Sequence, residues 1–572
     1  MKALNKNAMP KRDLYIFWAS LLIHIALFII NLCVGGYHVD EIMTVLNARS
    51  IADNAQSITG IRLPFYFDTW IYGGQSPFAT YLTALSVRLL SYSMLAVRLP
   101  ALVIGMISLL AFYGFLREII KDERYISVIF LFGAFSPWHL FSGSYVLDCN
   151  YFAHAVIIAM YFLAKAINGR KAVYYVLSMA FFALGFYSYM ASVFFIPIML
   201  AVTFIYLLAR RKVSVGKTAL SVISLALFSL PFILFGLVNV GAVDEFELLG
   251  FSFYKMPEYN RSSSMSFMNS TGIFFAMLNC FKQLFLSIDM LFFQGVVSVT
   301  AIGLNRFGYS CLFGGVLVAI ETVSLVINAI KKRRKMNKTA TAFAMGITAG
   351  VFLFCAALNE PRSAVFYRYE LLTYFLVIPM GAGFVKLCEI IKRLLNKTNG
   401  RNVPLKAVLV KATAVYMCIS GIIFCFNFYT YSNQIYTDDS IYGDSLVKAL
   451  DFAEDMNAEK IVLYNADKEL NKYNYNGRET VFLRWYYYEK KDFTHSFYDE
   501  LKGRGMCAYE ELLKPEEYIV TTDGYLEYKN PENEIISDDF CIVPDTELDV
   551  VKYDSSKYEL KEFGLWNVIY KK

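Results

Sequence analysis

Residues 14–41 read LYIFWASLLIHIALFIINLCVGGYHVDE, an apolar run followed by a short polar segment that ends in two adjacent carboxylates. About twenty apolar residues are enough for one helix to cross a bilayer. The run follows a basic leader, but it is longer than the apolar region of a signal peptide and lacks a small-residue cleavage site. We therefore interpret Leu14–Val34 as a retained first membrane span.

The composition of the whole chain agrees with this interpretation. Its 572 residues are 57% hydrophobic and only 18% charged, and the mean hydropathy is +0.43, which is unlike a soluble domain. Charged residues become frequent only after about residue 430. The sequence therefore predicts a polytopic α-helical membrane domain over residues 1–430 and an extracytoplasmic α/β domain over residues 431–572.

Eleven segments are apolar and long enough to cross the bilayer. We place the predicted spans at 14–34, 97–118, 125–145, 149–167, 172–187, 190–209, 218–240, 309–330, 339–357, 370–390 and 405–428. An odd number of spans puts the two termini on opposite sides of the membrane.

The distribution of basic residues sets the orientation, because cytoplasmic loops are enriched in Lys and Arg. The basic clusters lie at 117–124, 165–171, 210–212, 331–335 and 392–401, whereas the turns near 146 and 188 have none. This pattern predicts a cytoplasmic N-terminus and an extracytoplasmic C-terminal domain in a multi-pass plasma membrane protein. The net charge of +6 is spread over these clusters, so no nucleic acid partner is expected.

Two outer loops, 35–96 and 241–308, are long and only partly apolar. We expect residues 78–92 and 272–300 to lie along the membrane interface as amphipathic helices. The alternative that 78–92 is a true span stays open, although it would change the parity of the topology.

The polar C-terminal region has the pattern of a small α/β domain. A helix is expected near Ser445–Met456, strands at 460–464 and 518–522, and a final pair of strands within 558–570. If this region is outside the cell, Cys507 and Cys541 could form a disulfide. The sequence leaves that pairing open.

Candidate site residues gather in the loops assigned to the outer side. Sequence motifs for nucleotide binding, zinc proteases and serine hydrolases are absent. Asp40 and Glu41 stand directly after the first span, and ionisable groups at that depth are costly unless they pair or act. The other candidates on this side are Arg98, Asp148, Arg362, Arg368 and Tyr369. An acidic residue before a helix can also simply cap it, so Asp40, Glu41 and Asp148 have a structural alternative.

On the basis of these residues, the first 430 residues resemble the membrane glycosyltransferases of the GT-C fold, in particular the protein O-mannosyltransferases and aminoarabinose transferases. The resemblance rests on the Asp40-Glu41 pair, a Pro-containing segment that leads to Tyr81, and Arg98-Leu99-Pro100 at the entry to a span. It implies a polyprenyl-phosphate donor that carries one sugar and a transfer with inversion.

The resemblance also implies roles for the candidate residues. Asp40 would be the general base on the acceptor, and Glu41 its neighbour in positioning. The donor phosphate or sugar would be bound by Arg98, Asp148, Arg362, Arg368 and Tyr369. Cationic donors suit a leaving phosphate, and a carboxylate suits proton removal from a hydroxyl.

The sequence departs from the family in two places. Gln75-Ser76-Pro77 stands where aminoarabinose transferases have a lysine-proline pair, and the first outer loop has no Asp-x-Asp motif. We therefore expect no cofactor and no required divalent cation. A transporter, flippase or polymerase of lipid-linked glycans, or a non-enzymatic envelope scaffold, remains an alternative. The sequence names neither the sugar nor the acceptor, which could be a protein, a glycan or a lipid.

Overall fold

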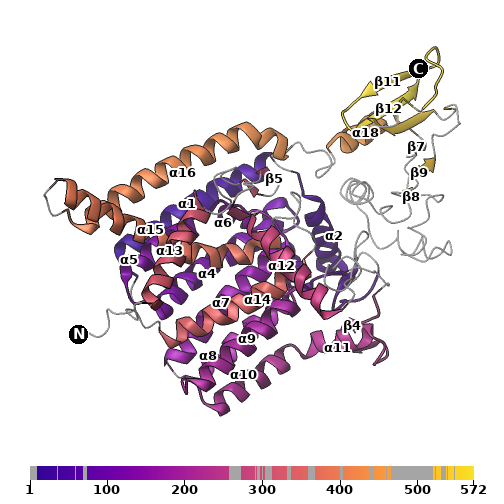
Figure 1. Cartoon of the computed structure of the whole chain (residues 1–572). Coiled ribbons are helices and arrows are strands. Elements are labelled where there is room, and N and C mark those ends of the chain that lie inside the picture. Colours follow the sequence, from indigo (N-terminus) through magenta and orange to yellow (C-terminus); the bar gives the residue numbers. More distant parts are fainter. Residues whose placement is uncertain are drawn as a thin grey trace.

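The protein is a helical bundle followed by a small mixed sheet, as its computed structural model shows (Figure 1). The structure describes residues 9–34, 36–57, 60–68, 74–169, 171–256, 272–289, 291–292, 297–298, 301–302, 312–330, 337–358, 368–399, 403–436, 444–458, 460–464, 519–521, 524–529, 536, 539–545, 548–549 and 551–572. These residues confirm the predicted class, a polytopic α-helical protein with a C-terminal α/β region.

Seventeen helices occur in the described residues. They are α1 (Lys11–Val34), α2 (Val39–Asn54), α3 (Pro77–Leu90), α4 (Met94–Ile119), α5 (Glu123–Ala134), α6 (Pro137–Ser142), α7 (Asp148–Gly169), α8 (Ala172–Phe186), α9 (Ser192–Ala209), α10 (Val215–Phe228), α11 (Leu230–Asn239), α12 (Ile273–Asp289), α13 (Gly314–Ile330), α14 (Lys338–Ala357), α15 (Glu370–Asn399), α16 (Leu405–Tyr436) and α18 (Asp444–Asp455).

Each of the eleven predicted spans contains a helix, but fewer of them qualify as full spans. Within the described residues, seven helices are long and apolar enough to cross a membrane, namely α1, α4, α7, α9, α14, α15 and α16. An eighth crossing is possible where α10 and α11 meet at a bend of 56°. The predicted span 125–145 is divided into α5 and the short α6, and α8 and α13 are shorter apolar helices. The count of eleven is therefore not reproduced, although the positions of the helices are.

The two long outer loops contain the helices that the sequence predicts there. Residues 78–92 correspond to α3, which packs against α2, and α12 begins within the predicted segment 272–300. The first loop also has the short strands β1 (Phe67–Asp68) and β2 (Gly74–Gln75), which pair antiparallel. Hairpins in the second loop are formed by β3 (Phe246–Leu248) with β4 (Phe251–Phe253), and by β5 (Val297–Ser298) with β6 (Ala301–Ile302).

The C-terminal sheet has six strands in the order β11-β12-β10-β7-β9-β8. Its strands are β7 (Lys460–Tyr464), β8 (Ile519–Thr521), β9 (Gly524–Lys529), β10 (Phe540–Pro544), β11 (Tyr558–Glu562) and β12 (Trp566–Lys571). The strand β7 pairs in parallel with both β9 and β10. All four strands predicted in this region are confirmed, and β9 and β10 are additional.

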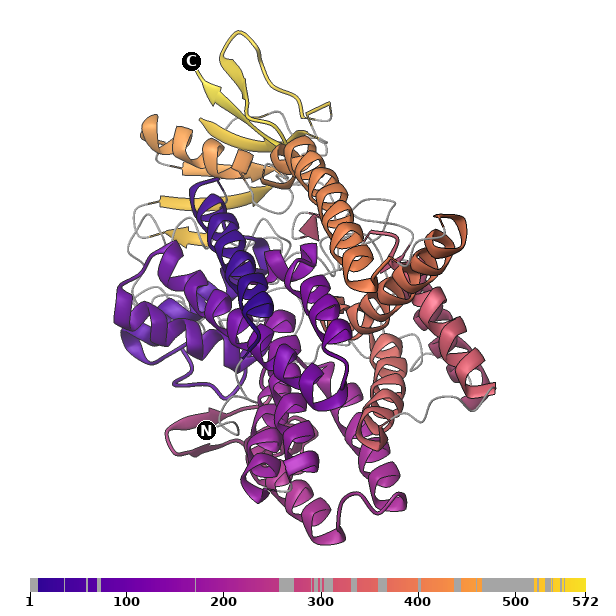
Figure 2. The ribbon, with the colours of Figure 1, turned by 90° about the vertical axis from the view of Figure 1, so that its left-hand side faces the viewer.

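The C-terminal strands lie at one end of the molecule in both views (Figures 1 and 2). The long helix α16 runs along one side of the bundle toward α18 and the sheet. Cys541 lies on β10 and is buried, whereas Cys507 lies outside the described residues, so their pairing stays a prediction.

Glycines bring pairs of long helices into close contact, as is common in membrane bundles. A Cβ on Gly383 of α15 would overlap the backbone carbonyl of Leu317 on α13. A Cβ on Gly346 of α14 would likewise meet the Met199 carbonyl of α9 at 2.6 Å. These backbone contacts cannot be relieved by a side-chain rotation, so they fix how the helices pack.

Replacing Gly383 by Ala is therefore expected to destabilise the bundle by about 1–3 kcal/mol, the usual cost of overpacking. The matched control is Gly421→Ala on α16, where a new Cβ would have no atom within 4 Å. Thermal unfolding of the two purified variants in the same detergent gives the comparison. Equal unfolding temperatures would show that α13 and α15 do not depend on this contact.

Candidate active site

Asp40 lies in the first turn of α2, shortly after the C-terminal end of α1. The helix is capped by His38, whose Nδ1 accepts the Asp40 backbone N–H at 3.1 Å. Glu41 completes a capping box, because its Oε2 accepts the His38 backbone N–H at 3.0 Å. The Asp40 side chain is half-buried. The cap of α2 is thus made by His38 and Glu41, and Asp40 is not needed for it.

Glu41 is fully buried and accepts four hydrogen bonds. Besides His38, its oxygens accept from Arg98 Nε at 3.1 Å and Arg98 Nη2 at 2.7 Å, and from the backbone N–H of Val146 at 2.9 Å. A carboxylate with these partners is held in one geometry and has no access to a substrate. This geometry fits a role for Glu41 in positioning its neighbours and does not fit a role in catalysis.

Arg98 is the partner that holds Glu41, and it is fully buried on α4. Its remaining N–H groups approach the carbonyl oxygens of Asn31 at 3.1 Å and Gly36 at 2.9 Å, and the Sδ of Met94 at 3.2 Å. All five donors of the guanidinium are therefore engaged. The prediction that Arg98 binds the donor phosphate does not fit this geometry. The side chain instead ties α4 to the end of α1 and the start of α2.

Asp148 is the first residue of α7, and its carboxylate accepts the backbone N–H of Cys149 at 2.7 Å. The bond from Val146 to Glu41 joins the segment before α7 directly to the start of α2. The helix ends that carry Asp40 and Asp148 are consequently fixed to each other through Glu41.

The Cys149 thiol shows which charged groups converge here. It is buried and lies within electrostatic range of Asp148, Glu370, Arg368 and Asp40. Three of these, Asp40, Asp148 and Arg368, are candidates from the sequence. The fold thus brings together residues that are more than 300 positions apart in the chain.

The start of α15 contributes two predicted residues to this region. Arg368 is half-buried and Tyr369 is fully buried, and both lie in the turn that leads into the helix. Burial raises the pKa of the Tyr369 phenol, so it stays protonated at neutral pH and can donate a hydrogen bond. Arg362 lies outside the described residues.

The segment around Gln75 and Ser76 packs onto α2. The Gln75 side-chain amide donates to the hydroxyl of Thr44, and the Ser76 hydroxyl lies 3.3 Å from that of Tyr66. Tyr81 of α3 donates to the Pro64 carbonyl oxygen at 2.7 Å, and burial raises the pKa of its phenol. These contacts hold the first outer loop against the bundle. Their geometry indicates structural roles.

A cluster of buried polar residues beneath the site was missed by sequence reasoning. It contains Glu370 and Tyr374 of α15, His139 of α6 and His154 of α7. The signal that could have found it is the presence of ionisable residues inside apolar runs, which are costly in a membrane. Among the described residues, no group of three or more His, Cys, Asp or Glu could hold a metal ion.

Comparisons with known proteins agree with the sequence. Residues 74–235 match the family model described as dolichyl-phosphate-mannose-protein mannosyltransferase. No curated protein matches the chain significantly. The family match confirms the resemblance to the membrane glycosyltransferases, over less than a third of the chain.

Two solved structures are similar to this chain at TM-scores below 0.5. The Archaeoglobus fulgidus oligosaccharyltransferase tethered with an acceptor peptide is 13% identical, with a TM-score of 0.47, and the match covers 82% of this chain and 62% of that one. ArnT from Cupriavidus metallidurans bound to undecaprenyl phosphate is 13% identical, with a TM-score of 0.42, over 97% of each chain. The chain spans between 55% and 62% of the archaeal enzyme's length.

The geometry of Arg98 predicts that it acts on stability. Arg98→Met leaves the Glu41 carboxylate buried without its charge partner, which typically costs about 3–5 kcal/mol. The control is Arg88→Met on α3, because Arg88 is exposed and donates only to the Ala52 carbonyl oxygen. We expect a much lower unfolding temperature for the first variant alone. A stable Arg98→Met protein with weakened donor binding would instead restore the phosphate role.

Proposed function

We propose that this protein is a glycosyltransferase that moves a single sugar from a polyprenyl-phosphate donor to an acceptor on the extracytoplasmic face. The observation that carries the proposal is that Asp40, Asp148 and Arg368 each lie near Cys149, at the start of α7. The matched family model, whose description names a dolichyl-phosphate sugar as donor, supports the same chemistry.

The three residues supply the groups that such a transfer needs. The half-buried Asp40 carboxylate takes the proton of the acceptor hydroxyl as the new glycosidic bond forms. Arg368 stabilises the negative charge that develops on the leaving phosphate. Asp148 orients the sugar through its hydroxyl groups. A base and a leaving group on opposite sides of the anomeric carbon give inversion, and no metal is required for these steps.

An apolar cavity within the bundle suits the donor's lipid chain. It has a volume of about 430 Å³ and is lined by α1, α5, α6 and α16, with Ile23, Phe135 and Phe424 among the lining side chains. Ile30 continues the lining along α1 toward the end that precedes α2. A lipid in this cavity would therefore carry its phosphate toward the helix end near Asp40. A polyprenyl chain gains free energy from burial against such surface.

The proposed location follows from the basic loops. With the N-terminus in the cytoplasm, as the basic loops predict, Asp40 and Asp148 lie on the extracytoplasmic side of the plasma membrane. The acceptor is then a protein, glycan or lipid exposed on that side. The C-terminal domain, on the same side, would contact the acceptor.

Asp40→Asn is expected to lower transfer by about 10²–10⁴-fold, the usual contribution of a positioned base, without changing the unfolding temperature. The matched control is Asp53→Asn on the same helix, where the side chain is exposed and pairs only loosely with Arg49 at 4.0 Å. Cells without the protein, and cells with wild type or either variant, are compared by mass spectrometry of polyprenyl-phosphate sugars and surface glycans.

Accumulation of one lipid-linked monosaccharide with loss of one surface sugar, restored by wild type and Asp53→Asn alone, would identify donor and acceptor together. Full activity of a folded Asp40→Asn protein would remove Asp40 from the role of base. No change in either pool would favour the transporter or scaffold alternatives.

Arg368→Ala should weaken binding of the donor more than it slows turnover. Loss of a charge-assisted hydrogen bond costs about 1.5–3 kcal/mol, which corresponds to an increase of about 10- to 100-fold in the apparent donor constant. Arg88→Ala is the control, since Arg88 is exposed on α3. An unchanged donor constant in the Arg368 variant would place the phosphate elsewhere.

A further inference from the structure

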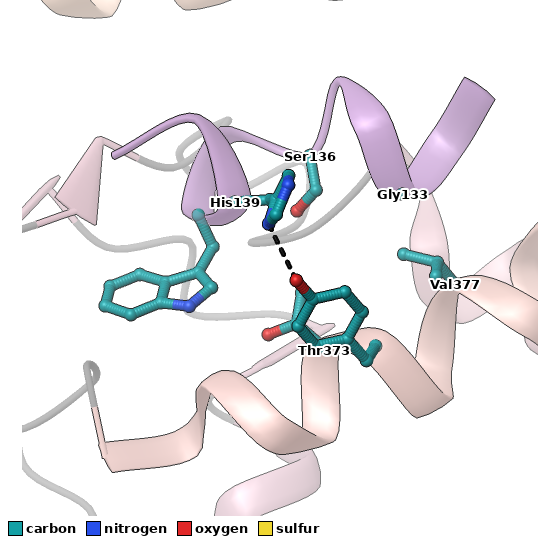
Figure 3. Close-up of a pocket in the computed structure, with 7 residues that line it drawn as sticks. Gly133, Ser136, His139, Thr373 and Val377 are labelled. Carbon is teal, nitrogen blue, oxygen red and sulfur yellow. Dashed lines mark hydrogen bonds between the residues drawn. The ribbon is translucent and has the colours of Figure 1, made fainter. Parts of the chain in front are cut away.

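A small cavity lies beneath the candidate site, between α6 and α15. Its volume is about 10 Å³, close to the smallest that holds one water molecule. Figure 3 shows Ser136 and His139 on one side of this cavity and Thr373 on the other. The cavity thus lies where α6 and α15 face each other.

Three buried polar atoms of the lining have no hydrogen-bond partner among the described residues. They are the Ser136 Oγ, the His139 Nε2 and the Thr373 Oγ1, and each side chain is at most 3% exposed. An unsatisfied buried polar group costs about 1–3 kcal/mol. Empty cavities in proteins are apolar, whereas polar cavities of this size contain water. The lining therefore has the chemistry of a water site.

The other side of the His139 ring joins a continuous chain of hydrogen bonds. Its Nδ1 lies 3.0 Å from the Tyr374 hydroxyl, shown by the dashed line in Figure 3. That hydroxyl lies 2.8 Å from Ser108 Oγ, which in turn lies 2.8 Å from the Nδ1 of His154. The Nε2 of His154 is 3.8 Å from Glu370 Oε1. The hydrogen bonds thus run from the cavity to His154 on α7, and Glu370 at the start of α15 lies just beyond hydrogen-bond distance.

In either tautomer of His139, the ring atom Nε2 needs a hydrogen-bond partner. If Nδ1 carries the proton and donates to Tyr374, Nε2 is an acceptor, and in the other tautomer Nε2 is a donor. Serine and threonine hydroxyls can both donate and accept, as can water. One water can therefore satisfy His139, Ser136 and Thr373 together, whichever tautomer is present.

We propose that one buried water occupies this cavity, bonds to Ser136, His139 and Thr373, and locks α15 against α6. Thr373 and Tyr374 lie within two turns of Arg368. The water and the Tyr374 hydroxyl then hold the helix from two adjacent residues, which fixes where Arg368 stands at its end. The water site stands on geometry alone. Only its effect on Arg368 rests on the proposed function.

The first test is an experimental map of the wild-type protein at a resolution that shows ordered water. We expect density within hydrogen-bond distance of His139 Nε2 and Thr373 Oγ1. An empty cavity in a map that shows other buried waters would overturn the proposal.

The second test is the variant Thr373→Val, which keeps the side-chain shape and removes the hydroxyl. The conservative control is Thr373→Ser, which keeps the hydroxyl. We expect the unfolding temperature of the Val variant to be several degrees lower than that of the wild type. We also expect its apparent donor constant to be several-fold higher at nearly unchanged turnover. The Ser variant should match the wild type in both measurements.

The outcomes separate this proposal from the proposed function. If wild type transfers no sugar, density in the cavity and the lower unfolding temperature of Thr373→Val would still support the water site, while the effect on Arg368 would fall with the proposed function. If wild type is active and Thr373→Val equals it in both measurements, the positioning role is wrong. Ser136→Ala, which removes another partner of the water, gives the same decision should the Val variant not fold.

Discussion

The pair formed by buried Glu41 and Arg98 is the interaction on which the end of the bundle around the start of α2 depends. Through it α1, α2, α4 and the segment before α7 meet at one point. Two charges without solvent are costly unless every donor and acceptor is used, and here all five guanidinium donors are engaged. Asp40 and Asp148 stand at helix ends that this pair connects, so the placement of the candidate site is a result of its geometry.

Most of the helical architecture could be predicted from the sequence. A bilayer requires long apolar segments, and such segments can be recognised in a single sequence. Where the prediction of spans was wrong, the reason is local. Residues 125–145 are uncharged and largely apolar, but Pro137 begins a new short helix. The apolar run 218–240 bends where Pro231 stands at the start of α11. Hydropathy indicates whether a segment lies in lipid or in water, but it does not show whether that segment forms one unbroken helix.

The candidate site was predicted in part. The sequence predicted that Asp40, Asp148 and Arg368 share one side, and in the fold each of them lies near Cys149. The sequence could not show that Arg98 forms an ion pair with Glu41, because the two residues are 57 positions apart and a charged side chain does not by itself indicate its partner. It also could not show the polar cluster of His139, His154, Glu370 and Tyr374, which forms only when α6, α7 and α15 pack.

The strand order of the C-terminal sheet has a consequence for biosynthesis. The strand β7 is the first to leave the ribosome, yet it lies between β9 and β10, which are made about 60 and 80 residues later. Parallel pairing over such separations forms slowly, because the intervening chain must be closed into a loop first. The apolar strand β7, KIVLY, therefore waits unpaired after α16 has been synthesised. Until β9 and β10 have been made, this segment has no strand to pair with and is a candidate for chaperone binding.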